Sequence, residues 1–366
     1  MPTRRILLHM PNWLGDVVMA TPLLDHLARA AAAAGDGGRV DVAVRPAWAP
    51  LFRDDPRVGS LLPVERGGRH AGLGGLWRQG RELAAGGYAA VVLGPPSLRA
   101  GLVAALSRAS VRVGHSGDGR DWLLGSAVAR GPRGTRHHAW ELLDLGVAAV
   151  ADLGWPAPLL PDGDLPPPSL AGTAAWEAQP LPDERPLWVV APGTTYGEAK
   201  SWPAARVAEL VEAAVRDAGA RVVFLGDAAA APFAAALCSG SRRRAAAAWA
   251  EAADLVDLTG RTDLVEVVRV LRAATAFVGN DSGLMHVAGA LGVPTVGVFG
   301  SSNPDWTRPL GPWTTAVTAA GFPCRPCYRR TCNQPEFCLA TIGGAEVFAA
   351  ACDLVARRGA ATEERS

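Results

Sequence analysis

Lysine is almost absent from this chain of 366 residues, in which Lys200 is the single lysine among 36 basic side chains. The others are arginines, whose rigid planar head differs from the compact ammonium of lysine. Lys200 lies in the turn Ala-Pro-Gly-Thr-Thr-Tyr-Gly-Glu-Ala-Lys-Ser-Trp-Pro (191–203). A compact cation in such a turn indicates a phosphate-like anion, and the alternative is one lysine left by chance in an arginine-rich chain.

The chain also lacks long hydrophobic runs and an excess of charge. No stretch approaches about 18 uninterrupted apolar residues, so no membrane-spanning helix is expected. The apolar run near the N-terminus is short and is interrupted by His9 and Pro11, unlike a signal peptide. The net charge of +1 argues against a nucleic-acid partner held by bulk electrostatics. We therefore expect a cytoplasmic protein.

Two common nucleotide-binding patterns are missing. There is no G-x-x-x-x-G-K-[ST], and the nearest approach to G-x-G-x-x-G, at 72–77, lacks its last glycine. ATP hydrolysis and nicotinamide chemistry are therefore disfavoured. The serine of Gly-Asn-Asp-Ser-Gly (279–283) is the fourth residue where a hydrolase elbow needs it third, so a serine hydrolase is not expected.

Short β-branched runs alternate with Ala/Leu-rich stretches along the chain, which predicts parallel sheets covered by helices. The length exceeds what one core supports, and a proline-rich segment divides it. We predict an α/β protein with an N-terminal Rossmann-like domain (1–154), a linker (155–186), a C-terminal Rossmann-like domain (187–345) with a cysteine-rich insert (322–340), and a C-terminal helix and tail (346–366). The carboxyl ends of both sheets would face a central cleft.

The predicted elements follow from apolar periodicity, caps and breakers. Strands are expected at 5–10, 40–44, 89–93, 111–114, 187–191, 221–225, 275–278 and 295–299, and helices at 21–34, 73–85, 97–107, 138–150, 203–217, 228–238, 262–274 and 282–291.

An anion site is predicted where the strand at 275–278 meets the next helix. Asp281 or Ser282 would cap that helix, its free amides and dipole would attract an anion, and Gly283 would let a ligand approach the backbone. Lys200 follows the first strand of the same domain, at the equivalent edge. A diphosphate fits this combination, although a capped helix after a strand is also common without a ligand.

The first strand of the N-terminal domain ends in Pro-Asn-Trp-Leu-Gly-Asp (11–16). Gly15 permits a tight turn and places Asp16 at the carboxyl end of that strand. A carboxylate there is suited to act as a general base on a hydroxyl. The alternative is that Asp16 caps the first helix.

These segments together resemble the glycosyltransferase family of the ADP-heptose:lipopolysaccharide heptosyltransferases, particularly the heptosyltransferase II type. The motifs run in order through almost the whole chain, from Pro-Asn-Trp-Leu-Gly-Asp through Pro-Gly-Thr-Thr (192–195) and Lys-Ser-Trp-Pro (200–203) to Asn-Asp-Ser-Gly-Leu-Met-His (280–286) and Val-Phe-Gly-Ser-Ser-Asn-Pro-Asp (298–305). The resemblance implies a GT-B fold and inverting, metal-independent transfer of heptose from ADP-heptose to a lipid-linked oligosaccharide, with peripheral membrane contact and no cofactor.

The resemblance also implies roles for residues at matching positions. Asp16 would be the catalytic base, and Lys200 would stabilise the leaving diphosphate. The residues that would bind substrate are Asn12, Gly15, Thr194, Thr195, Asp281, Ser282, Gly283, Leu284 and His286. The family usually has a glutamate after the second strand of this domain, where the chain has Asp227.

Four cysteines, Cys324, Cys327, Cys332 and Cys338, are dense enough to suggest a structural metal or disulfide site, but their irregular spacing also fits packed free thiols. The arginines and tyrosine among them would form a basic patch, either for an anionic lipid or simply solvated. The one Asp-x-Asp, at 162–164, lies in the proline-rich linker, and no catalytic metal is expected. Two other functions stay open: transfer from another nucleotide-sugar to a different glycan, and non-catalytic nucleotide-sugar binding.

Overall fold

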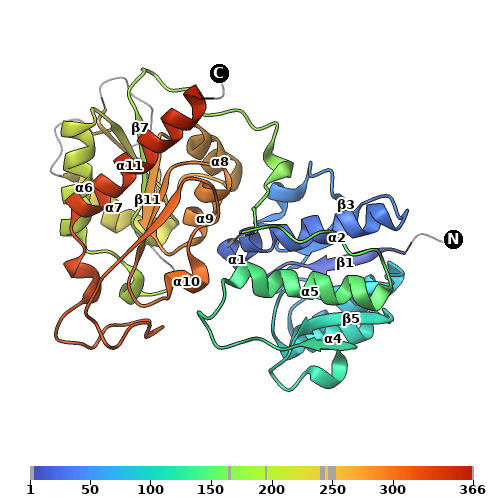
Figure 1. Cartoon of the computed structure of the whole chain (residues 1–366). Helices are drawn as coiled ribbons and strands as arrows, with labels where there is room; N and C mark the ends of the chain where they lie inside the picture. The colour runs from blue at the N-terminus through green and yellow to red at the C-terminus, as the bar shows by residue number, and fades with distance from the viewer. Residues whose placement is uncertain (1–3, 164–165, 194–195, 240–243, 246–252, 365–366) are drawn as a thin grey trace. The chain divides into compact units, whose positions relative to one another are not determined.

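A computed structural model gives the fold and describes residues 4–163, 166–193, 196–239, 244–245 and 253–364. The chain divides into two compact units, Met1–Ala175 and Trp176–Ser366. Each unit is an α/β structure built on a parallel sheet (Figure 1).

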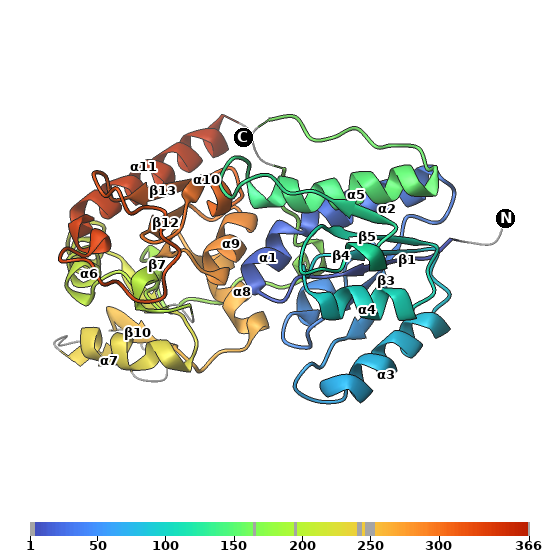
Figure 2. The same ribbon diagram turned by 90° about the horizontal axis from the view of Figure 1, so that it is seen from below.

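The first unit contains a six-stranded sheet in the order β3-β2-β1-β4-β5-β6. Its strands are β1 (Ile6–His9), β2 (Val40–Val44), β3 (Val58–Pro63), β4 (Ala90–Leu93), β5 (Val111–His115) and β6 (Ser126–Val128), and its helices are α1 (Leu14–Met19), α2 (Thr21–Ala33), α3 (Gly72–Ala85), α4 (Leu98–Leu106) and α5 (His138–Leu153). Figure 2 shows α2 and α5 on one face of this sheet and α3 and α4 on the other.

The second unit contains a seven-stranded sheet in the order β13-β12-β11-β7-β8-β10-β9. Its strands are β7 (Leu187–Ala191), β8 (Arg221–Phe224), β9 (Arg244–Ala245), β10 (Leu255–Asp257), β11 (Ala276–Asn280), β12 (Thr295–Phe299) and β13 (Thr314–Thr318), and its α-helices are α6 (Ala204–Asp217), α7 (Ala231–Ser239), α8 (Leu264–Ala273), α9 (Gly283–Ala290), α10 (Pro304–Thr307) and α11 (Gly344–Glu363).

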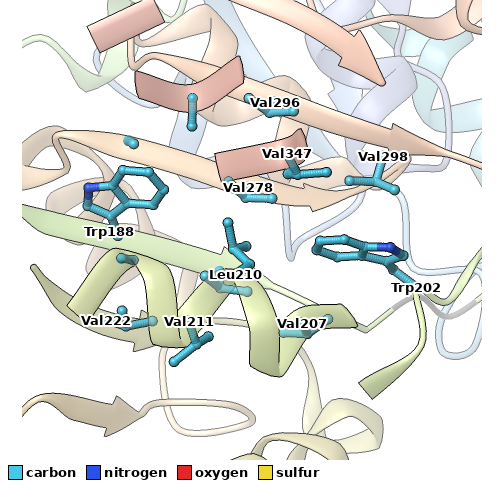
Figure 3. Close-up of a cluster of buried hydrophobic side chains, with 14 of the residues drawn as sticks. Trp188, Trp202, Val207, Leu210, Val211, Val222, Val278, Val296, Val298 and Val347 are labelled. Atoms are coloured by element: carbon cyan, nitrogen blue, oxygen red, sulfur yellow. The ribbon is translucent and has the colours of Figure 1, made fainter. Parts of the chain in front are cut away.

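The core of the second unit explains why its strands are so apolar. Every residue of β7 and β12 is buried, as expected for a parallel sheet covered on both faces. Alternate residues of the central strands, such as Trp188 and Val278, pack against Leu210 of α6 and Val347 of α11 (Figure 3). Helices α6 and α11 therefore cover one face of this sheet.

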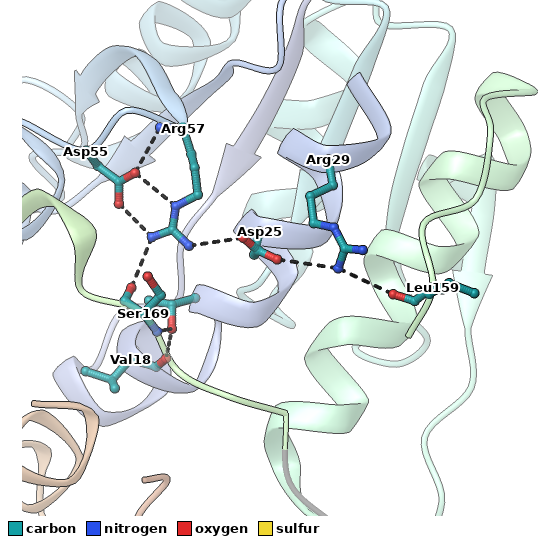
Figure 4. Close-up of polar contacts among 8 residues, drawn as sticks. Val18, Asp25, Arg29, Asp55, Arg57, Leu159 and Ser169 are labelled. Atoms are coloured by element: carbon teal, nitrogen blue, oxygen red, sulfur yellow. Dashed lines mark hydrogen bonds and ion pairs between the residues drawn. The ribbon is translucent and has the colours of Figure 1, made fainter. Parts of the chain in front are cut away.

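Part of the proline-rich segment belongs to the first unit. The Ser169 amide donates to the Thr21 hydroxyl at 3.0 Å, and the Arg57 guanidinium donates to the Ser169 carbonyl at 3.1 Å (Figure 4). Arg57 is itself held by a two-point contact with Asp55. Further along, the Gln179 amide donates to the Arg269 carbonyl in the second unit. The division between units thus falls inside the segment predicted as a linker.

Candidate active site

The loops after β7 and β11 meet at one place in the second unit. The strands that follow β7 in the chain, β8 and β10, lie on one side of it in the sheet. The strands that follow β11, β12 and β13, lie on the opposite side. The adjacent strands β7 and β11 therefore mark the switch point of this sheet, where open α/β sheets bind their ligands beyond the carboxyl ends of the strands. Lys200 lies in the loop after β7, and Asp281 directly follows β11.

Asn280, the last residue of β11, fastens the Lys200 loop at both ends. Its Nδ2 donates to the Pro192 carbonyl at 2.5 Å, and its Oδ1 accepts from the Trp202 amide at 3.1 Å. The side chain is buried, so these hydrogen bonds are shielded from water. Sequence reasoning did not single out Asn280, which acts here as a positioning residue for the loop.

Lys200 forms an ion pair with Asp281, with 2.5 Å between Nζ and Oδ2. Both side chains are largely buried, at 15% and 7% exposure, so the pair is screened less than a surface pair. The ammonium also lies 4.7 Å from the centre of the Tyr196 ring, within the range of a cation–π contact. A lysine has three N–H donors, so one carboxylate contact leaves donors for anion oxygens.

The start of α9 lies beside this ion pair. Ser282 is the residue that precedes the helix, but its hydroxyl does not cap it, and Asp281 is paired with Lys200 instead. The expectation that one of these side chains caps the helix is therefore wrong: the Asp281 carboxylate is paired with Lys200, and the Ser282 hydroxyl makes no hydrogen bond to the helix amides. In the described part of the chain, the buried hydroxyls of Ser282, Ser301 and Ser302 find no hydrogen-bond partner. Hydroxyls without a hydrogen-bond partner and helix amides without a side-chain cap are suited to bind a ligand rich in oxygen atoms.

Asp16 lies in the first turn of α1, which begins at Leu14 after the residue Trp13. Asp16 was predicted at the carboxyl end of the first strand, and it lies in the short helix that follows that strand. The alternative, that Asp16 caps this helix, does not hold, because Trp13 occupies the capping position. The Asn12 carbonyl accepts hydrogen bonds from Trp48 Nε1 at 3.1 Å and from Arg45 at 3.3 Å, which fix the turn before the helix. This turn follows β1, next to β4, at the switch point of the first sheet.

The same edge of the first unit is rich in positive charge. Burial, together with the nearby charges of Arg66 and Arg99, lowers the pKa of His9, at the end of β1, to about 3. Burial, Arg99 and Arg45 likewise lower the pKa of Arg66. Sequence reasoning did not identify this cluster, because its members are brought together from the ends of several strands.

Comparison with known proteins decides the family. The family model described as glycosyltransferase family 9 (heptosyltransferase) matches residues 76–337. The chain belongs to glycosyltransferase family 9. It is 33% identical over 325 residues to lipopolysaccharide heptosyltransferase 2 of Salmonella typhimurium, covering 84% of this chain and 85% of that protein. It is 30% identical over 341 residues to lipopolysaccharide heptosyltransferase 1 of Pseudomonas aeruginosa, covering 90% and 88%.

A solved structure described as E. coli ADP-heptose lps heptosyltransferase II matches this family 9 chain with a TM-score of 0.71 and 25% identity, covering 97% of this chain and 99% of that one. The predicted GT-B fold is confirmed. Among the described residues, no helix combines the length and apolar content needed to cross a bilayer.

The remaining predicted residues of this family 9 protein are placed as follows. Thr194 and Thr195 lie outside the described residues. Gly283 and Leu284 are the first two residues of α9, and His286, its fourth residue, is buried. Asp227 is exposed and caps the 3-10 helix Ala228–Ala230 by accepting from the Ala229 amide at 3.1 Å.

The four clustered cysteines line one small cavity of about 20 Å³. Over the part of the chain that the structure describes, no three His, Cys, Asp or Glu side chains are grouped closely enough to hold a metal ion. The thiols of the cluster are free in the structure.

Proposed function

We propose that this protein transfers a heptose from ADP-heptose to the inner-core oligosaccharide of a lipopolysaccharide precursor, with inversion at the anomeric carbon. The observation that carries the proposal is the buried Lys200–Asp281 ion pair beside the start of α9 at the switch point of the second sheet. Family membership and the named activities of the relatives support the donor and the acceptor.

The Lys200 ammonium and the amides at the start of α9 are proposed to bind the donor diphosphate. Asp281 accepts one hydrogen bond from the ammonium and so fixes its direction. When the bond between the anomeric carbon and the diphosphate oxygen breaks, the electron pair leaves with ADP. A fixed cation and oriented amides stabilise that charge more in the transition state than in the bound donor. Ser282, Gly283, Leu284 and His286 would contact the nucleotide-sugar, together with Thr194 and Thr195.

Asp16 is proposed as the general base. Its carboxylate would take the proton from the acceptor hydroxyl as that oxygen attacks the anomeric carbon from the face opposite the leaving ADP, which inverts the configuration. Asn12 and Gly15 would shape the turn that presents the carboxylate. The arginines around His9 would suit an acceptor that carries an anionic group, because basic side chains bind carboxylates and phosphates.

Peripheral contact with the inner face of the cytoplasmic membrane is part of the proposal, since the acceptor is lipid-linked. Helix α3 supports it: Leu73 and Trp77 are 85% and 54% exposed one turn apart, and Arg78 and Arg81 lie on the same helix. Apolar and basic side chains together favour an anionic bilayer surface. We expect the wild-type protein to co-sediment with phosphatidylglycerol vesicles and the variant Trp77→Ser not to do so. Equal binding of the wild type and the variant would contradict this expectation.

The test of the transferase proposal separates chemistry from donor binding. Asp16→Ala should abolish transfer, measured as ADP release with acceptor present, while calorimetry finds an ADP affinity within a few-fold of wild type. Unchanged turnover in this variant would refute the role of Asp16. Release measured over a panel of nucleotide-sugars tests the donor, and a rate insensitive to EDTA is expected if Lys200 and the helix amides supply the stabilising charge.

A further inference from the structure

The cysteine-rich segment is in direct contact with the Lys200 loop. The Ala199 amide donates to the Arg330 carbonyl at 3.0 Å. A Cβ on Gly197, whose φ is 149°, would lie 2.5 Å from the same carbonyl oxygen. The two backbones can approach this closely only because residue 197 has no side chain. The segment around Arg330 thus forms one wall of the candidate donor site.

Tyr196 links the two segments through its hydroxyl and its ring. The hydroxyl donates to the Tyr328 carbonyl at 2.5 Å. The ring centre is 4.7 Å from the Lys200 ammonium and 5.6 Å from the Arg330 guanidinium carbon. The two cations therefore lie within about 10 Å of each other, with one aromatic ring as their common support.

These two cations differ in their partners. The charge of Lys200 is balanced by the Asp281 carboxylate. Arg330 is exposed, and no carboxylate among the described residues forms an ion pair with it. A diphosphate carries more than one negative charge, so a site whose one ammonium is already balanced leaves that charge under-compensated. An arginine fork is well matched to phosphate oxygens.

The segment that carries Arg330 is held firmly against the sheet. Arg325 donates to the Gly300 carbonyl at 2.7 Å and to the Phe299 carbonyl at 3.1 Å, at the end of β12. The Tyr328 amide donates to the Ser301 carbonyl at 2.8 Å. Tyr328 has a φ of 51°, a left-handed conformation that a bulky residue adopts only where the surroundings impose it.

We propose that Arg330 is a second phosphate-binding residue of the donor site and that the cysteine-rich segment serves to present it beside Lys200. The inference rests on the proposed function, because it takes a nucleoside diphosphate as the ligand of this site. It adds a residue from a segment to which the transfer mechanism assigns no task.

The test compares two neighbouring arginines by calorimetric titration of the full chain with ADP and with AMP. Arg330→Gln should weaken ADP binding roughly five- to tenfold at low salt, and less in high salt, because the contact is exposed and screened. AMP, which lacks the second phosphate, should lose less. The matched control is Arg329→Gln, since Arg329 is also exposed and contacts Asn333 instead. Arg330→Lys, which keeps the charge, should retain most of the affinity.

The outcomes are distinguishable. If wild-type protein binds no ADP, the proposed donor fails and this inference fails with it. If wild-type protein binds ADP but Arg330→Gln and Arg329→Gln lose affinity equally, the role of Arg330 alone is overturned. Equal losses for Arg330→Lys and Arg330→Gln would likewise contradict a contact made through charge.

Discussion

Replacing Asn280 by alanine tests whether one buried amide holds the donor loop in place. The side chain is 1% exposed and makes two hydrogen bonds to main-chain groups, the Pro192 carbonyl and the Trp202 amide. Alanine removes both bonds and leaves a buried donor and a buried acceptor without a partner. Each such group costs about 1 to 3 kcal/mol, so a loss of roughly 2 to 6 kcal/mol in the unfolding free energy of the second unit is expected.

The assay is calorimetric melting, supported by hydrogen exchange of peptides that cover residues 192–203. A loss of this size lowers the melting temperature by roughly 4 to 24 °C for a unit of this length. Exchange in the 192–203 peptides should rise more than in the core strands, because the loop is released before the sheet opens. Asn333→Ala is the control, since this asparagine is exposed and its replacement should change stability by less than about 0.5 kcal/mol.

The reasoning would be refuted by a melting temperature for Asn280→Ala within a degree or two of Asn333→Ala, together with unchanged exchange in the loop. Such a result would mean that the loop is held by other contacts and that the two hydrogen bonds of Asn280 contribute little net stability.

Three further predictions concern binding, pH and stability. Lys200→Ala should weaken ADP binding by roughly 10- to 100-fold in calorimetry and lower turnover with it; an unchanged ADP affinity would place the diphosphate elsewhere. Burial lowers the pKa of His9 to about 3 and that of His115 to about 4. Because the unfolded chain takes up these protons near pH 6.5, the unfolding free energy should fall as the pH drops below about 6.5, by up to about 1.4 kcal/mol per pH unit for each histidine. Denaturant titrations at pH 7 and pH 5 measure this loss, which should be smaller in His9→Asn; an equal loss in both proteins would contradict it. Gly359→Ala, at an exposed position of α11 where a Cβ meets nothing within 4 Å, should stabilise the chain by up to about 1 kcal/mol, and a lower melting temperature would contradict this.

Most of the fold could be predicted because its central strands are continuous apolar runs. Strands β2, β7 and β12 match their predicted bounds, since each is buried on both faces and ends at a breaker or a polar residue. The missed strands are short or lie at the sheet edges. Edge strand β3, for example, is exposed or half-buried at all but its first residue and has no continuous apolar pattern to reveal it.

Only part of the candidate donor site could be predicted from the sequence, because only part of it is marked by local patterns. Lys200 and Asp281 stand out in the sequence because each lies in a recognisable turn, and the structure brings them into contact. Asn280 was missed because its partners are 78 and 88 residues away, and no local pattern records such contacts. The hydroxyls of Ser301 and Ser302 stand out only because they are buried without a hydrogen-bond partner, and burial of this kind cannot be recognised from the sequence.

A chain with one lysine has one ε-amine, and here that amine is held in the candidate donor site against Asp281. Amine-directed reagents thus have a single side-chain target besides the chain terminus. A label at position 200 would report occupancy of the site directly, and protection of that amine by a bound molecule would reveal ligands even when no transfer occurs.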